Sequence, residues 1–253
     1  MSDAAIARIS YPDSKAFQSM IEALSKIIDE VSMKLGPEGA RIRALDPAKI
    51  ALIDIKLPPS AFLEYSVEEE ASIGFNVANF LKLLKRGKRG DRLEIEAKGD
   101  RVTITMVGDV VRRYSILNLD VLEPEIPEAR FSFNASATLM ADLVKNAIRD
   151  AEAVGDTVEF DAPDTTVFYI RGVGPEGSGA ETRLTAETDQ LIEYNVSEAS
   201  KARYSIDYLK HVLSLTKVAD LVTVEFSTDA PLRLGFSLPG EGRVEYLLAP
   251  KLE

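Results

Sequence analysis

Hydrophobic residues recur along this chain with two different spacings, and each spacing predicts one kind of element. Spacings of three and four, as at Phe17, Met20, Ile21 and Leu24, are typical of a helix with one apolar face. Alternation at every second position is typical of a half-buried strand. The helical spacing predicts four helices, within residues 17–31, 75–84, 140–148 and 204–213.

The alternating runs are short and are separated by turn residues, as in antiparallel sheets. In the first half they cover residues 4–10, 31–35, 40–45, 50–57, 64–66, 71–76, 91–96, 101–106 and 112–116. In the second half they cover residues 129–135, 157–160, 165–170, 181–186, 191–196, 220–225, 232–238 and 243–248. The predicted fold class is therefore α+β, with helices packed on antiparallel sheets.

The order of the elements repeats, with half the chain as its period. The segment 75–100 matches the segment 204–229 after a shift of 129 positions, and both read as helix, turn at an aspartate, then strand. The helix and strand pair of 17–45 recur over 140–170. We therefore predict two similar domains, 1–118 and 129–253. The acidic segment 119–128, with two prolines, is expected to be an extended linker.

Composition and charge narrow the class of protein. The chain has no cysteine, which excludes a disulfide scaffold and any thiolate metal site. It has no apolar run long enough for a membrane span and no signal-peptide pattern, so we expect a cytosolic protein without a membrane partner. A net charge of −11 argues against nucleic acid as a partner when the chain is taken as a whole.

The motifs of enzymes are weak here. Residues 172–177 match G-x-G-x-x-G, but Pro175 and the strand-like segment after it predict a hairpin loop rather than a dinucleotide site. The single histidine, His211, is expected at a solvated helix position. Glu159 and Asp161 fall on one face of a strand and could share a cation. We predict a protein that is not an enzyme and needs no cofactor, with a metal-dependent hydrolase as the remaining enzyme alternative.

Positive charge gathers on the predicted helices, whereas acidic residues crowd the strands, loops and linker. In the second helix the spacing of Lys82, Lys85, Arg86 and Arg89 predicts one basic face. The other helices carry fewer cations, namely Lys15, Lys26, Lys145, Arg149, Lys210 and Lys217. If all four helices line one surface, that surface attracts the phosphates of double-stranded DNA without reading sequence.

Four segments are similar to motifs of one known family, namely the ending 245–253, the linker 119–128, the segment 45–52 and the basic helix around 82–85. Together they resemble the proliferating-cell-nuclear-antigen family of DNA sliding clamps, in particular its archaeal members. The resemblance covers essentially the whole chain. It implies two copies of one α+β domain per subunit and three subunits that close head to tail into a ring around DNA.

The resemblance also implies sites for partners. Subunits would meet at edge strands, through Arg112, Arg113, Tyr114, Ile116, Thr182, Arg183 and Leu184. A pocket for short partner peptides, called PIP boxes, would be lined by Leu45, Ile50, Ile126, Pro127, Pro231, Leu247, Ala249 and Pro250. The implied partners are DNA polymerase, clamp loader, flap endonuclease and DNA ligase, met at the nucleoid of an archaeal cell.

Three alternatives to a ring of identical clamp subunits stay open at this stage. The chain could belong to a mixed ring that requires paralogous clamp subunits, or to a checkpoint-type clamp. It could also be an oligomeric scaffold that never encircles DNA. Reversal of the charges at Lys82, Lys85 and Arg86 distinguishes the clamp from the scaffold.

Overall fold

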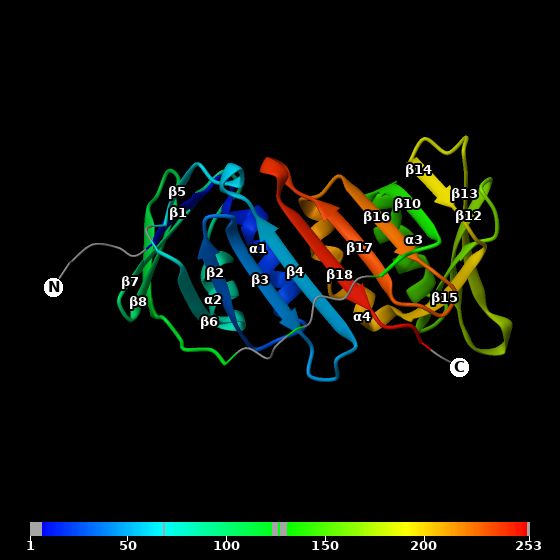
Figure 1. The fold of residues 1–253 in the computed structure, drawn as a ribbon, viewed down its shortest axis with the longest axis horizontal. Helices are drawn as coiled ribbons and strands as arrows, with labels where there is room; N and C mark the ends of the chain where they lie inside the picture. The colour runs from blue at the N-terminus through cyan, green and yellow to red at the C-terminus, as the bar shows by residue number, and fades with distance from the viewer. Residues whose placement is uncertain (1–6, 68, 123–125, 127–130, 252–253) are drawn as a thin grey trace. The chain divides into compact units, whose positions relative to one another are not determined.

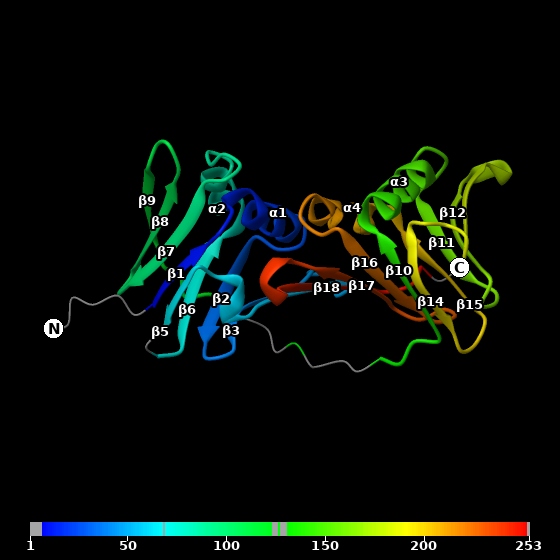
Figure 2. The same cartoon turned by 90° about the horizontal axis from the view of Figure 1, so that it is seen from above.

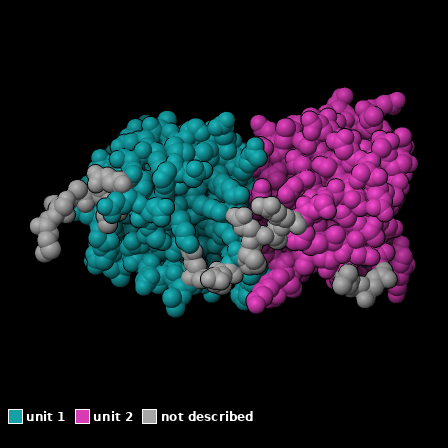
Figure 3. All heavy atoms as spheres, viewed as in Figure 1, with its two compact units in different colours: residues 1–47, 53–126, 238–244 teal, residues 48–52, 127–237, 245–253 magenta. Residues whose placement is uncertain are grey.

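The computed structural model describes the chain except for residues 1–6, 68, 123–125, 127–130 and 252–253 (Figure 1). The chain folds into two compact units (Figure 3). Unit 1 holds residues 1–47, 53–126 and 238–244, and unit 2 holds residues 48–52, 127–237 and 245–253. Each unit thus includes one short segment from the other half of the sequence. The predicted boundaries at 118/119 and 128/129 stay a prediction.

Unit 1 places its two helices together beside antiparallel strands. Helix α1 (Ser14–Leu24) packs on helix α2 (Val77–Leu84). One sheet has the order β5-β1-β7-β8-β9, and further strands follow one another in the order β4-β3-β2-β6. The strands are β1 (Ala7–Tyr11), β2 (Glu30–Gly36), β3 (Gly39–Leu45), β4 (Ala51–Leu57), β5 (Glu64–Val67), β6 (Ala71–Asn76), β7 (Arg92–Lys98), β8 (Arg101–Val107) and β9 (Arg112–Leu117).

Unit 2 has the same composition of elements. Helix α3 (Ala141–Glu152) packs on the short helix α4 (Ile206–Lys210), which a 3-10 turn at Leu213–Lys217 follows. One sheet has the order β13-β12-β11-β15, and further strands run in the order β14-β10-β16-β17-β18. The strands are β10 (Ala135–Met140), β11 (Thr157–Ala162), β12 (Val167–Val173), β13 (Gly179–Thr185), β14 (Leu191–Val196), β15 (Ser200–Ser205), β16 (Leu221–Phe226), β17 (Leu232–Ser237) and β18 (Arg243–Leu248).

Helices on antiparallel strands in both units confirm the α+β prediction (Figure 2). The internal repeat is visible in the main-chain hydrogen bonds that begin the helices. The first residue of each helix donates to the carbonyl of an aspartate next to a strand, over 2.8–2.9 Å. The four pairs are Ser14 with Asp91, Val77 with Asp29, Ala141 with Asp220 and Ile206 with Asp156. Each bond satisfies a donor that has no partner within its own helix.

Each unit has an apolar core with aromatic residues at its centre. In unit 1, Phe80 of α2 lies 4.6 Å from Phe75 and 6.3 Å from Phe17, measured between ring centroids. In unit 2, Phe160 stacks on Phe168 at 6.1 Å. All of these rings are buried, so they anchor the helices to the sheets.

The helix predictions are correct in number but not in extent. The first helix ends at Leu24, so Ile28 and Val31 lie outside it, and Val31 belongs to β2. The second helix begins only at Val77, because the Asn76 side chain accepts a hydrogen bond from the Asn79 N–H and caps it. Phe75 therefore belongs to β6, and by the same repeat Tyr204 belongs to β15.

The strand predictions fail at two places. Strand β15 lies in a region that we assigned partly to the fourth helix and otherwise left without an element. The strand predicted at 129–135 begins only at Ala135, with residues 129 and 130 outside the described residues. The strand predicted at 4–10 is confirmed from Ala7 onward, and its residues 4–6 lie outside the described residues. The hairpin loop predicted at 172–177 is confirmed, because β12 and β13 pair on either side of it.

Candidate functional site

The most strongly basic segment lies at the carboxyl end of α2. Lys82 is in its last turn, Lys85 caps the helix, and Arg86 and Arg89 follow it. All four side chains are exposed, and none forms an ion pair with a carboxylate among the described residues. We call these four residues the basic cluster. The helix dipole favours cations at this end.

The predicted single helical face is wrong in part. The helix ends at Leu84, and a tight turn follows in which the Arg86 N–H donates to the Leu83 carbonyl over 3.0 Å. Arg86 and Arg89 therefore belong to a loop that contains Gly87 and Gly90. Since this loop starts at the helix end, the four charges still lie within one short segment.

The cations on the other helices are more often neutralised. Lys145 pairs with Asp142 on the preceding turn, and Lys210 lies 2.5 Å from Glu152. The Lys15 ammonium donates to Gln18 over 2.7 Å. The remaining predicted positions, Lys26, Arg149 and Lys217, are exposed. Unit 1 thus holds the stronger candidate surface for phosphate.

The two segments predicted for subunit contact are both edge strands. Strand β9 ends the sheet β5-β1-β7-β8-β9, and β13 ends the sheet β13-β12-β11-β15. Arg113 and Arg183 are exposed, and Arg112, Tyr114, Ile116 and Thr182 are half-buried. Leu184 is 2% exposed and belongs to the core of unit 2, so only its main chain is available at the edge. Edge strands offer unpaired N–H and C=O groups to another strand.

The residues predicted for the partner peptide are divided between the two units. Unit 2 holds Ile50, Pro231, Leu247, Ala249 and Pro250, and unit 1 holds Leu45 and Ile126. In unit 2 the Ala249 N–H donates to the Ile50 carbonyl over 2.9 Å, which brings an exposed isoleucine beside the last residues of the chain. Pro127 lies outside the described residues. The common pocket stays a prediction.

Two models of known protein families match this chain. The family model for the N-terminal domain of proliferating cell nuclear antigen matches residues 8–123, and the model for the C-terminal domain matches residues 125–251. The chain belongs to the proliferating cell nuclear antigen family. The resemblance noted in the sequence is thereby confirmed.

Relatives of this family are similar over nearly the whole chain. The DNA polymerase sliding clamp 1 of Aeropyrum pernix is 40% identical over 94% of this chain and 97% of its own length. The DNA polymerase sliding clamp of Thermofilum pendens is 34% identical over 96% and 98%. These matches confirm the prediction of a sliding-clamp subunit.

Solved structures agree with that assignment. The crystal structure of PCNA from Thermococcus kodakaraensis has a TM-score of 0.90 at 30% identity, covering 97% of this chain and all of that one. A chain of the PCNA2–PCNA3 complex from Sulfolobus tokodaii has a TM-score of 0.91 at 26% identity, with the same coverage. The clamp fold is therefore shared over both units.

Glu159 and Asp161, the two acids considered as ligands of a metal ion, are already paired with basic side chains. Glu159 pairs across the sheet with Arg171 and Arg203, and its carboxylate lies 3.0 Å from both Lys201 and Arg203. Asp161 lies 2.5 Å from Arg171. Burial by itself would raise the pKa of Glu159, but the hydrogen bonds from Lys201 and Arg203 outweigh it and lower that pKa. The acids hold the sheet together by ion pairs.

The position of His211, the other residue considered for catalysis, differs from the prediction. His211 is half-buried rather than solvated, and its ring lies 5.4 Å from that of Tyr208, so the predicted solvated position is wrong. The described residues contain no group of three or more His, Cys, Asp and Glu side chains arranged for a metal ion. No described helix is long and apolar enough to cross a membrane.

Sequence reasoning missed one group of polar residues in unit 1. Arg41, Arg43 and Lys56 surround Asp54, with nitrogen–oxygen distances of 2.7, 3.5 and 3.6 Å. Arg43 also reaches the linker, where its Nη1 donates to the carbonyl of Ile126. The alternation of these residues on β3 and β4 was visible, but their link to the linker depends on the folded chain.

Proposed function

We propose that this chain is one subunit of a ring that encircles double-stranded DNA and tethers DNA polymerase to it. The observation that carries the proposal is the basic cluster. Four exposed cations without a carboxylate partner among the described residues stand together in a chain of net charge −11. Such a segment attracts phosphate through the release of counterions and is insensitive to base sequence.

The mechanism needs only weak contact with DNA. A closed ring retains DNA by its topology, so the cations can exchange between phosphates and the ring can slide. A polymerase bound to the ring stays near its template at a high effective concentration. In this mechanism the chain makes and breaks no covalent bond.

Ring closure would use the edge strands β9 and β13, which a head-to-tail contact joins in successive subunits. The proposed assembly is a trimer of this chain or of this chain with paralogous clamp subunits. A PCNA2–PCNA3 complex among the similar structures supports the second form. The trimer would work at the nucleoid of an archaeal cell.

Partner enzymes would bind through short peptides. DNA polymerase, clamp loader, flap endonuclease and DNA ligase are the proposed partners, each through a PIP box with aromatic and aliphatic anchors. The exposed side chain of Ile50 beside Ala249 supports an apolar site at this place. Such a site has no need of a metal or cofactor.

The test is charge reversal in the basic cluster. The variant Lys82→Glu/Lys85→Glu/Arg86→Glu is expected to assemble normally but to lose most of its stimulation of polymerase processivity on primed DNA. The matched control is Lys98→Glu/Arg101→Glu/Arg243→Glu, which reverses three exposed cations at the ends of strands. The control is expected to retain its stimulation.

Assembly and DNA tethering are measured separately, by sedimentation and by the length of the extended primer. A variant that assembles and still stimulates the polymerase fully would contradict encirclement through the basic cluster, and would favour a scaffold. Equal loss in the control would mean that total charge, and not the cluster, determines DNA binding.

A further inference from the structure

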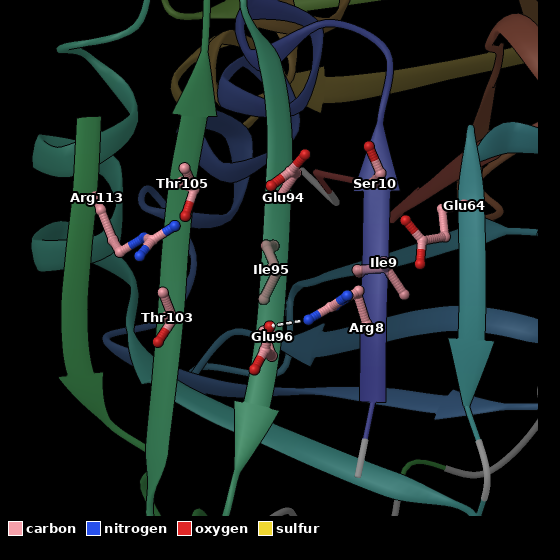
Figure 4. Close-up of a pocket in the computed structure, with 10 residues that line it drawn as sticks. All are labelled: Arg8, Ile9, Ser10, Glu64, Glu94, Ile95, Glu96, Thr103, Thr105 and Arg113. Atoms are coloured by element: carbon pink, nitrogen blue, oxygen red, sulfur yellow. Dashed lines mark hydrogen bonds and ion pairs between the residues drawn. The ribbon is translucent and has the colours of Figure 1, made fainter. Parts of the chain in front are cut away.

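A polar pocket lies on one face of the sheet β5-β1-β7-β8-β9 in unit 1 (Figure 4). Its volume is about 430 Å³. Strand register places a row of side chains across all five strands, because each pair is directly cross-strand. The row is Glu64, Ser10, Glu94, Thr105 and Arg113.

Ser10 is the unusual member of this row. It is 4% exposed, and its hydroxyl has no hydrogen-bond partner among the described residues. Such a hydroxyl costs stability, since burial removes it from water without replacing the lost hydrogen bond. Figure 4 shows it on β1 between the carboxylates of Glu94 and Glu64. The unused hydroxyl and the two acids thus form one set of acceptors.

Some charged side chains of the pocket have an ion-pair partner, and others have none among the described residues. Arg8 pairs with Glu96 at 2.8 Å, and this contact raises the pKa of Arg8, with smaller contributions from the charges of Glu64 and Glu94. Glu94 lies 2.6 Å from Arg92, which leaves further acceptor positions on its carboxylate. Glu64 is exposed and has no ion-pair partner among the described residues. The end of the pocket at Glu64, Ser10 and Glu94 therefore favours a cation.

We propose that the acceptor set of Glu64, Ser10 and Glu94 binds an arginine side chain of a partner protein. Glu64 and Glu94 flank β1, so their main chains are two strand spacings, about 10 Å, apart. A planar guanidinium has five N–H donors in a fork and can reach both carboxylates and the hydroxyl between them. A compact ammonium has three donors on one atom and spans this distance less well. No described residues here are arranged for a metal ion.

A partner protein is favoured over a free cation by the surroundings of the site. Leu63 is 63% exposed, and its N–H donates to the carbonyl of Ser10 over 2.8 Å, so an apolar side chain stands next to the acceptor set. Arginine beside an apolar contact is typical of the residues that dominate protein interfaces. The proposal does not rest on DNA encirclement, and its test uses no DNA.

The test is a titration of the full chain, labelled at threonine methyl groups, with three peptides followed by NMR. The peptides are acetyl-Gly-Arg-Gly-amide and its lysine and citrulline analogues. The arginine peptide at millimolar concentration is expected to shift the methyl signals of Thr103 and Thr105, which line the pocket, and not that of Thr223 in unit 2. The lysine peptide should bind at least threefold more weakly, and the neutral citrulline peptide should cause no shift.

Two variants link the binding to the acceptor set. Glu64→Gln/Glu94→Gln should weaken the arginine peptide at least tenfold, while the control Glu30→Gln/Glu69→Gln changes the same charge at exposed positions outside the pocket and should bind normally. Ser10→Ala should weaken binding severalfold without lowering the melting temperature, because it removes an unpartnered hydroxyl.

Several outcomes would overturn the proposal. They are no shift with the arginine peptide, equal shifts with the citrulline peptide, or equal weakening in the control variant. Spermidine is titrated in parallel, and tighter binding of spermidine at the same methyl groups would identify a polyamine site in place of a protein contact. None of these outcomes bears on DNA encirclement, so the two proposals fail independently.

Discussion

The Nη1 atom of Arg43 donates a hydrogen bond of 2.9 Å to the main-chain carbonyl of Ile126, 83 residues further along the chain. Arg43 is mostly buried, with 21% of its side chain exposed, and its Nε lies 3.5 Å from the carboxylate of Asp54. The main chain at Ile126 of the linker is therefore bound to β3 by Arg43, and Arg43 is positioned by its ion pair with Asp54. Ile126 is one of the residues proposed to contact partner peptides.

Removal of this contact should weaken the binding of partner peptides. We expect Arg43→Ala to lower the affinity for a fluorescent PIP-box peptide about fivefold, since a lost hydrogen bond costs ~1 kcal/mol. The control Lys56→Ala removes another partner of Asp54, one that forms no hydrogen bond or ion pair with the described residues of the linker. Fluorescence anisotropy measures both, and equal affinities for the Arg43 and Lys56 variants would contradict a role of Arg43 in holding Ile126.

The two edge strands predict the oligomeric state. We expect sedimentation equilibrium of the pure chain to give three times its mass of 27.7 kDa. Val111 and Leu117 flank the proposed contact on β9 and are 59% and 54% exposed. Val111→Asp/Leu117→Asp should therefore yield a folded monomer, because charge is costly in a buried contact.

The matched control for assembly is Ile192→Asp/Leu122→Asp, which places the same charges at exposed apolar positions elsewhere. It should remain a trimer. A wild-type chain that stays monomeric alone but assembles with a paralogous subunit would indicate a mixed ring. A wild-type trimer that both double variants leave intact would move the subunit contact away from β9.

The ion pairs of Glu159 predict a loss of stability in acid. The folded state lowers the pKa of Glu159 below its ordinary value of 4.5. The contribution of its ion pairs to the free energy of unfolding is therefore complete above pH 4.5 and is lost as the pH falls through the folded pKa. Glu159→Gln leaves Arg171, Lys201 and Arg203 without their shared carboxylate and should lower the free energy of unfolding by about 3 kcal/mol at pH 7.

Urea unfolding at several pH values checks this expectation, with Glu187→Gln as a control at an exposed carboxylate. The difference between wild type and Glu159→Gln should shrink as the pH falls below 4.5. A difference that stays constant with pH would show that the substitution acts through packing and not through charge.

The basic cluster predicts a specific dependence on salt. We expect Arg89→Gln to reduce the slope of log affinity for a short DNA duplex against log salt by about 0.9, the value for one phosphate contact. Lys145→Gln should change the slope less, because Lys145 is already paired with Asp142. Fluorescence anisotropy over a range of salt concentrations measures these slopes. Equal slopes for Arg89→Gln and wild type would show that Arg89 does not contact DNA.

Local pattern was sufficient for many of the elements. The strands at 71–76, 191–196 and 243–248 have the predicted bounds. In 243–248 every second residue is buried, because burial of one sheet face imposes a period of two on the residues themselves. The repeat of half the chain was likewise readable, and so was the concentration of cations near α2. The family resemblance rested on motifs of this local kind.

The ends of the helices were less predictable, because they depend on single caps and turns. An apolar residue before a helix has the same spacing whether it belongs to the helix or to the preceding strand, which is why Phe75 and Tyr204 were placed in helices. The end of α2 before Arg86 is followed by the turn in which the Arg86 N–H donates to the Leu83 carbonyl, and the spacing of the charges does not reveal this turn.

Contacts between distant segments were decided only by tertiary structure. The cations around Glu159 come from β12 and β15, Ser10 lies between acids of β5 and β7, and Arg43 meets Ile126. The sequence by itself determined which residues alternate, where cations gather and that the chain repeats. It did not determine these contacts, because strand register joins residues by their position across a sheet, and a shift of one residue would turn each side chain to the opposite face.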